Sequence, residues 1–139
     1  MRPDPVDEGS RWLDQAKEDL TSAEVLLREE RFYLVCFLAQ QVAGKAFKAH
    51  LYARGASVVL GHSVEELGRR AASNDISLEE IRQRAAELDA YYVPTRHPNG
   101  LPASIPARVF GRESAVRALA LAREVVEAID QCWPQGQAS

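Results

Sequence analysis

One apolar run constrains the fold more than any other part of this chain. Residues 32–38 are apolar nearly all round, so the run alone fits either a buried strand or a buried helix. Its continuation over residues 39–48 is rich in Ala, Gln and Lys, which propagate helices well. We therefore predict one long helix from about Phe32 to Arg54, ended by Gly55. Because every side of it is apolar, this helix should lie at the centre of the molecule.

Two further long helices are predicted at the two ends of the chain. The first runs from about Val6 or Ser10 to Arg28, and its apolar residues recur at helical spacing. These residues are Trp12, Leu13, Ala16, Leu20, Ala23, Leu26 and Leu27. The last helix runs over residues 112–133, and Pro134 stops it. Its buried side is predicted to carry Val116, Leu119, Ala120, Val126 and Ile129.

Two capping signals divide the segment between these helices. Ser63 is predicted as an N-cap with Glu66 as its capping-box partner, opening a short third helix that ends near residue 72. Ser77 with Glu80 repeats the pattern and opens a fourth helix that ends before Pro94. Four of the seven prolines then fall in an irregular segment, residues 94–110. Five helices with short connections give an all-α, up-and-down helical bundle, predicted as a single domain over residues 1–139 with a core from about 6 to 133.

The composition excludes several classes of protein. A net charge of -3 argues against bulk electrostatic capture of nucleic acid or anionic lipid, although it leaves room for a local basic patch. The sequence has no run of about 18 apolar residues, so no membrane span is predicted. Residues 1–8 lack the apolar core of a signal peptide. Cys36 and Cys132 have no CxxC partner, so we interpret both as reduced thiols of a cytoplasmic protein, with Cys36 in the core. Two isolated cysteines and three scattered histidines do not have metal-site spacing, so no metal or cofactor is expected.

Residues 91–100 form the most distinctive polar segment, with two tyrosines, a cation, an imidazole and an Asn-Gly turn between helices. Arg96 can grip a phosphate through its planar guanidinium, or it can be a structural residue that caps helix carbonyls or pairs with Asp89. Tyr92 can stack on a base, or one of the two tyrosines can simply belong to the core. His97 can act as a general base only beside a positioned partner, which the sequence does not show.

Three residues outside this segment complete the candidate site. Lys45 and Lys48 are three positions apart, so they share one helix face and can form a positive pocket with Arg96; the alternative is a solvated stripe. His62 precedes an N-cap, where it can sit beside an anion at the helix N-terminus or hydrogen-bond a neighbouring loop.

Other polar residues of the central helix have structural interpretations. A buried amide must be hydrogen-bonded, so at least one of Gln40 and Gln41 is expected to meet a loop backbone or a dimer mate. His50 lies near Arg54 and is expected at the surface or in an interface.

Four pieces of the chain occur in the order and spacing of one known family. They are Trp12-Leu13-Asp14-Gln15-Ala16 with Asp19-Leu20 and Ala23, Phe37-Leu38-Ala39-Gln40-Gln41-Val42-Ala43 with Lys45-Ala46 and Lys48, Gly61-His62-Ser63 with Leu67, and Tyr91-Tyr92-Val93-Pro94-Thr95-Arg96-His97-Pro98. They resemble the first helix, the second helix, the threonine–histidine–aspartate–leucine connection and the tyrosine–arginine–tyrosine–proline loop of the HEPN domain family. These helical domains are named for higher eukaryotes, prokaryotes and nucleotide binding.

The resemblance implies a helical bundle that usually forms a homodimer, with functions that differ among members. Some members are metal-independent ribonucleases and toxins, others are partners of small nucleotidyltransferases encoded beside them, and others are nucleotide-binding accessory domains. The ribonuclease members resemble one another in an arginine followed, after four to six residues, by a histidine. Here His97 follows Arg96 at once. Gly44 stands where many relatives have a glutamate, and we interpret it as permitting close helix approach at a cost of about 1 kcal/mol relative to alanine.

Three hypotheses for the function follow. The first is a non-catalytic homodimeric module that binds a nucleotide such as ATP or GTP, or another phosphate-bearing ligand, around a set of six candidate residues: Lys45, Lys48, His62, Tyr92, Arg96 and His97. The second is a regulatory, toxin- or antitoxin-type partner of a small nucleotidyltransferase. The third, a metal-independent ribonuclease acting on RNA, ranks last because the arginine–histidine spacing is absent. No catalytic residue is assigned.

Overall fold

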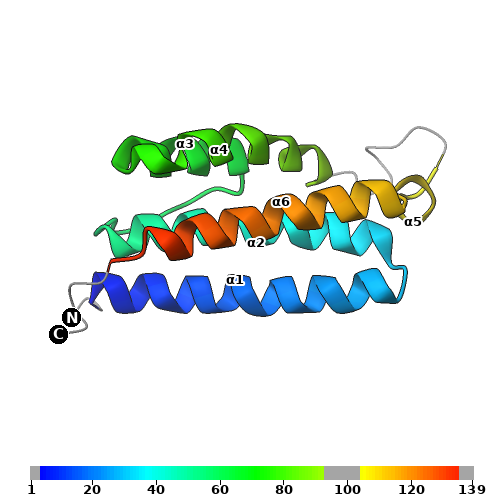
Figure 1. The fold of residues 1–139 in the computed structure, drawn as a ribbon, viewed down its shortest axis with the longest axis horizontal. Coiled ribbons are helices and arrows are strands. Elements are labelled where there is room, and N and C mark those ends of the chain that lie inside the picture. The colour runs from blue at the N-terminus through cyan, green and yellow to red at the C-terminus, as the bar shows by residue number, and fades with distance from the viewer. Residues whose placement is uncertain (1–3, 93–103, 135–139) are drawn as a thin grey trace.

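Three long helices lie side by side and form the body of the molecule, with the first antiparallel to the other two, which run parallel to each other (Figure 1). They are α1 (Pro5–Arg28), α2 (Phe32–Ala53) and α6 (Arg112–Gln131). The computed structural model describes residues 4–92 and 104–134. Helix α2 packs against α1, α3 and α6, so the prediction of a central apolar helix is confirmed. Its end at Gly55, which has φ +102°, also agrees with the sequence.

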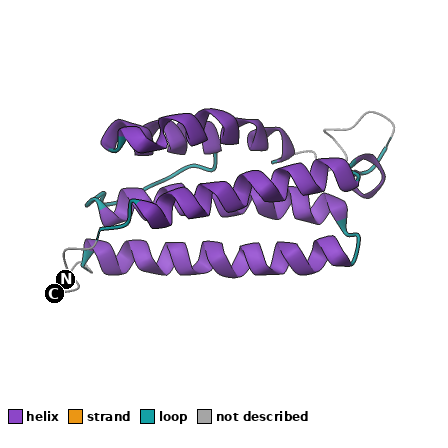
Figure 2. Ribbon diagram, viewed as in Figure 1, coloured by secondary structure: helices purple, strands orange, loops and turns teal. Residues whose placement is uncertain are grey.

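A second layer of short helices covers one side of this body. It consists of α3 (Val64–Asn74), the 3₁₀ turn η1 (Ile76–Leu78), α4 (Glu79–Ala85) and the 3₁₀ helix η2 (Ala86–Tyr91). A four-residue helix, α5 (Pro106–Val109), precedes α6, in a segment for which the sequence predicts irregular structure. Figure 2 shows only helices and connecting loops in the ranges that the structure describes, which confirms the all-α class.

The two predicted caps of the second layer have different outcomes. Ser63 is the N-cap of α3, and its Oγ accepts a hydrogen bond from the Glu66 N–H at 3.1 Å, as predicted. Ser77 is not an N-cap. The carboxylate of Asp75 accepts the Ser77 N–H at 3.0 Å and the Ser77 hydroxyl at 2.6 Å, so the chain enters a 3₁₀ turn before α4 begins at Glu79. The Asp75 side chain thus caps the chain before the 3₁₀ turn, and no side chain caps the start of α4 itself.

The core lies where α2 meets α1, α3 and α6, and Cys36 is completely buried in it, as predicted. The predicted buried side of α6 is partly wrong, because Val116 is 48% exposed and Ala120 only half-buried. The buried stripe of α6 is instead Ala115, Ala118, Leu119, Leu121, Ala122, Val125, Val126 and Ile129. Small alanines on this stripe let α6 pack closely on α2.

His50 is a second correction, since it is 1% exposed rather than at the surface. Its Nδ1 lies 3.8 Å from the Sγ of Cys132, near the end of α6. Burial, and then the nearby charge of Arg54, lowers the pKa of His50 from 6.5 to about 4. The imidazole is therefore a neutral core group and takes no part in the candidate site.

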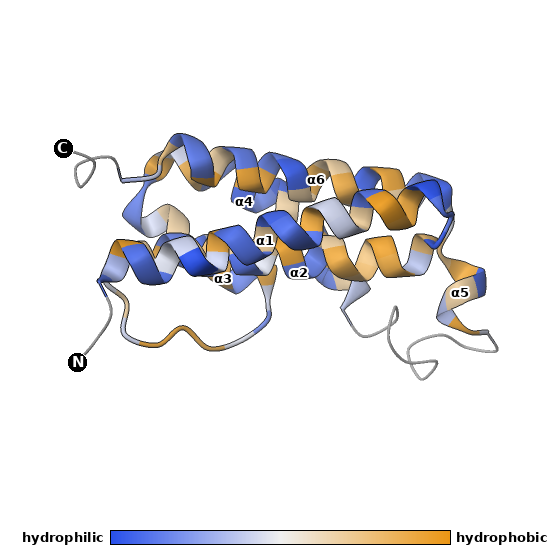
Figure 3. Ribbon diagram, turned by 90° about the horizontal axis from the view of Figure 1, so that it is seen from below, coloured by the Kyte–Doolittle hydropathy of each residue, from blue (hydrophilic) through white to orange (hydrophobic). Residues whose placement is uncertain are grey.

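The connection between α2 and α3 crosses the surface as a hydrophobic stretch, which is visible in Figure 3. Val59 is buried and its N–H donates to the Tyr52 hydroxyl at 3.0 Å, whereas Val58 and Leu60 are 65% and 78% exposed. No helix in the described ranges is long and apolar enough to cross a membrane.

Candidate functional site

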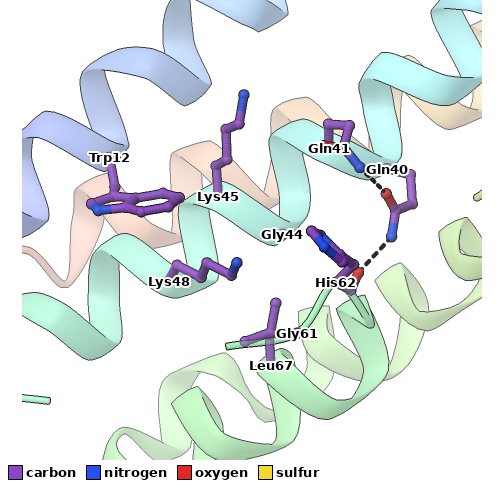
Figure 4. Close-up of a pocket in the computed structure, with 9 residues that line it drawn as sticks. All are labelled: Trp12, Gln40, Gln41, Gly44, Lys45, Lys48, Gly61, His62 and Leu67. Atoms are coloured by element: carbon purple, nitrogen blue, oxygen red, sulfur yellow. Dashed lines mark hydrogen bonds between the residues drawn. The ribbon is translucent and has the colours of Figure 1, made fainter. Parts of the chain in front are cut away.

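A cavity of about 220 Å³ opens between α1, α2 and the start of α3 (Figure 4). One face of α2 supplies four of the nine lining residues, Gln41, Gly44, Lys45 and Lys48, which follow each other at helical spacing. The other lining residues are Trp12 from α1, Gln40 from α2, Gly61 and His62 from the connection, and Leu67 from α3. Three of the six predicted site residues, Lys45, Lys48 and His62, thus share one cavity.

Lys48 is the cation that belongs to this cavity. In Figure 4 its side chain reaches from α2 toward the middle of the lining residues. Its Nζ lies 5.3 Å from the centre of the Trp12 ring, which is close enough for a cation–π interaction. Burial, and then the charge of Lys45, lowers the pKa of Lys48. No ion pair joins Lys48 to a carboxylate within the part of the chain that the structure describes.

Lys45 has a different environment, although it is only three residues away. Its Nζ lies 2.5 Å from Oδ2 of Asp19 on α1, and both side chains are largely buried. Figure 4 shows Lys45 reaching away from Lys48. The charge of Lys45 is therefore compensated within the protein, and the uncompensated positive charge of the cavity is that of Lys48.

The Trp12 ring is held in place on two sides. It stacks on Tyr52 with ring centres 5.5 Å apart and an angle of 24° between the planes. Its indole N–H donates to Oε1 of Glu8 at 3.3 Å. A second, more open hollow of about 530 Å³ shares Trp12 and Lys45 with the first and is otherwise lined by Glu8, Arg11 and Gln15. The two hollows therefore adjoin along the Trp12 ring and the Lys45 side chain.

The opposite wall is fixed by a buried amide. Gln40 is 1% exposed, and its Nε2 donates to the backbone oxygen of His62 at 2.7 Å and to Oδ1 of Asp89 at 3.1 Å. Its Oε1 accepts a hydrogen bond from Gln41 at 2.8 Å. The prediction that one of these glutamines meets a loop backbone is confirmed. The His62 ring stacks on Tyr92 with ring centres 5.4 Å apart and an angle of 18° between the planes, so Tyr92 contacts a lining residue without lining the cavity itself.

The N-terminus of α3 already holds an anion, and that anion is Asp89. Its Oδ1 accepts the Val64 N–H at 2.7 Å, and its Oδ2 accepts the Glu65 N–H and the Ser63 hydroxyl, each at 3.0 Å. The position of an anion at this N-terminus is therefore taken by the protein's own carboxylate, and the His62 ring contacts Tyr92. An external ligand would find these donors occupied.

Gly44 does not have the role predicted for it. A Cβ built on Gly44 would meet only Cδ1 of Leu67, at 3.9 Å, which is an ordinary contact. Gly44 therefore does not bring two helices close together. It forms open floor in the cavity between Gln41 and Lys48.

The chemistry of these groups is suited to holding an anion. Two ammonium groups, of which that of Lys45 is paired with Asp19, line a partly enclosed space together with two amides and one imidazole. Its remaining walls are an indole, a leucine and two glycines. Arg96 and His97, the other two predicted residues, lie outside the described residues. In the described ranges, no group of three His, Cys, Asp or Glu side chains could hold a metal ion. Trp12, Gln41 and Leu67 were not among the predicted site residues, because their meeting depends on how α1 and α3 dock on α2.

The chain is similar to one known family and to solved structures along most of its length. Residues 10–132 match the family model of the HEPN domain. A crystal structure of TT1696 from Thermus thermophilus is similar with a TM-score of 0.81 and 36% identity, over 88% of this chain and 96% of that one. The structure of ST0689, described as an archaeal HEPN homologue, is similar with a TM-score of 0.74 and 27% identity, over 91% of this chain and 98% of that one. No curated protein matches the chain.

The residues matched by the family model include all the residues that line the cavity and nearly all of the three long helices. The chain belongs to the HEPN domain family.

Proposed function

We propose that this protein is a non-catalytic module that binds a nucleotide or another phosphate-bearing ligand, with the anionic group of the ligand in the cavity beside Lys48. One observation carries the proposal: the ammonium of Lys48 is partly buried, lines a cavity and has no carboxylate partner among the described residues. A cation that is withdrawn from water without a counter-charge is unfavourable. An anionic ligand would compensate this charge and gain charge-assisted hydrogen bonds.

The size of the two hollows supports a ligand that is larger than a bare anion. The inner cavity of about 220 Å³ suits a phosphoryl group, and the adjoining hollow of about 530 Å³ leaves room for the body of a nucleotide. Trp12 lies between them and offers an aromatic edge, and Gln15 and Glu8 offer polar groups for recognition.

A thermal-shift panel on the wild type and on Lys48→Met tests this proposal. The ligands are ATP, GTP, ADP, GDP and inorganic phosphate. A ligand that binds only the folded state, at 100 times its dissociation constant, adds about 2.7 kcal/mol of stability. We expect a raised unfolding midpoint with at least one nucleotide, and we expect the shift to disappear in Lys48→Met.

The matched control is Lys17→Met, which removes the same charge from an exposed ion pair with Asp130 on the surface. It should keep the full ligand-induced shift. A panel with no shift in the wild type, or an equal loss of the shift in both variants, would overturn the proposal.

A second candidate is a regulatory partner of a small nucleotidyltransferase, in a toxin–antitoxin arrangement. The observation that favours it is the exposure of Val58 and Leu60, which lie on the connection that runs up to the cavity. In this case a Val58→Ser, Leu60→Ser double variant would lose co-purification with the partner and keep the ligand-induced shift.

We further propose that the module acts as a homodimer, which requires a native mass twice that of one chain at micromolar concentration.

A further inference from the structure

Two glycines buried within helices have a clear packing role. A Cβ on Gly9 would lie 2.6 Å from the backbone oxygen of Ala49, so α1 and α2 touch there. A Cβ on Gly68 would lie 2.9 Å from Cβ of Arg82 and 3.2 Å from the ring of Phe47. Any side chain at either position would collide with a neighbouring helix, so glycine is required by close packing.

Gly44 is also buried in a helix, but close packing does not require a glycine there. Its only neighbour for a new Cβ is Cδ1 of Leu67 at 3.9 Å. Its backbone is α-helical, and the glycines with positive φ in the described ranges are Gly55 and Gly61. Glycine is among the least favourable residues in the middle of a helix, and α2 is the central helix of the fold. A residue that disfavours the helix, and that neither close packing nor backbone conformation requires, is a candidate for a functional role.

The consequence of the missing side chain is space within the cavity. Gln41, Gly44 and Lys48 lie in line on one face of α2, and positions 41 and 48 are about 10 Å apart along the helix axis. A ligand that reaches the Gln41 amide and the Lys48 ammonium together must therefore pass over position 44. A methyl group at that position would stand in its path.

We propose that Gly44 is a specificity-determining residue, and that its bare backbone is the floor on which the phosphoryl group of the ligand lies between Gln41 and Lys48. This inference rests on the proposed function and adds a residue and a place for the phosphoryl group. It also explains how a substitution that improves the helix would impair the site. Stability and binding should therefore move in opposite directions at this one position.

The first arm of the test needs no ligand. Thermal unfolding is measured for the wild type, Gly44→Ala and Ser22→Ala, where Ser22 is an exposed position of α1 at which alanine improves the helix without touching the cavity. Gly44→Ala should raise the unfolding midpoint by about 4 °C, because alanine is a better helix former and has room. A lowered midpoint would mean that position 44 is closely packed, and would overturn the proposal.

The second arm measures binding of ATP and of inorganic phosphate by titration calorimetry. Gly44→Ala should raise the dissociation constant of both by about tenfold or more, and Ser22→Ala should leave both unchanged. A wild type that binds neither would overturn the proposed function itself. A wild type that binds, with Gly44→Ala binding equally well, would overturn only the role of Gly44. A loss for ATP without a loss for phosphate would place another part of the ligand over Gly44 and overturn the phosphoryl assignment.

Discussion

Among single residues, His50 should make the stability of the fold depend on pH. Its pKa is about 4 in the folded protein and has the ordinary value of 6.5 in the unfolded chain, so the unfolded state takes up the proton first as the pH falls. The stabilising contribution is complete above pH 6.5 and is lost as the pH falls toward 4. The loss amounts to about 3 kcal/mol of unfolding free energy.

Urea unfolding at intervals between pH 7 and pH 4.5 measures this loss. His50→Gln has no proton to gain, so its stability should change much less over the same interval, whatever its starting value. The charged neighbours of His50 are Arg54 and Asp75, and neither has its ordinary titration range between these pH values. An identical slope in wild type and variant would assign the pH dependence to other groups.

Lys48 and Gly44 are four residues apart and line the same cavity, but the sequence predicts their surroundings unequally well. The position of Lys48 on the same helix face as Lys45 could be predicted from spacing alone, since residues three apart share a helix face. The role predicted for Gly44 was wrong, because a sequence does not show whether the space beside a glycine is filled by another helix or left open. That distinction depends on Leu67, which reaches the site from α3.

At the level of elements, η2 holds the start of α3 through one carboxylate. Asp89 receives four hydrogen bonds, from Gln40, the Ser63 hydroxyl and the backbone N–H groups of Val64 and Glu65. Asp89→Ala would leave the buried Gln40 amide and two helix N–H groups without this acceptor. We expect a loss of about 2–3 kcal/mol of unfolding free energy, measured by urea denaturation.

Asp130→Ala is the matched control for this prediction. It removes an aspartate of the same size from an ion pair with Lys17 in which both side chains are nearly half exposed. Such surface pairs contribute about 1 kcal/mol or less. Equal losses in the two variants would show that Asp89 does not hold α3 in place.

The helices themselves could be predicted because their signals are local. The N-cap at Ser63 and the stop at Gly55 each depend on a few neighbouring residues, and both are confirmed. The buried side of α6 could not be predicted fully, because its many alanines offer two possible apolar stripes. Only the docking on α2 leaves Val116 outside and Ala118 inside. The same limit applies to Trp12 and Asp19, which meet the lysines of α2 through tertiary packing alone.

On the scale of the whole molecule, several positive charges of the described ranges are paired with carboxylates of other elements. Three arginines form ion pairs with glutamates of other helices, in the pairs Arg84–Glu124, Arg117–Glu87 and Arg123–Glu24. With a net charge of -3, the chain does not attract polyanions over its whole surface. Binding of an anion should therefore depend on the single uncompensated ammonium at the cavity rather than on an extended basic path.

The salt dependence of binding should report this arrangement. Along a nucleic-acid strand or duplex, each phosphate that a protein cation neutralises adds about 0.7 to 0.9 to the magnitude of the slope of log affinity against log salt concentration, because condensed counterions are released. ATP has no condensed counterion atmosphere of this kind, so we expect only a shallow slope when it is titrated at several NaCl concentrations from about 50 to about 400 mM, because Lys48 is one cation and Lys45 is already paired. A single-stranded RNA that contacted the protein through about six phosphates would give a slope of about 4. A steep slope with RNA, together with an affinity above that for ATP, would therefore favour an RNA-binding surface. A shallow slope for ATP that is lost in Lys48→Met would instead place the binding charge at one residue.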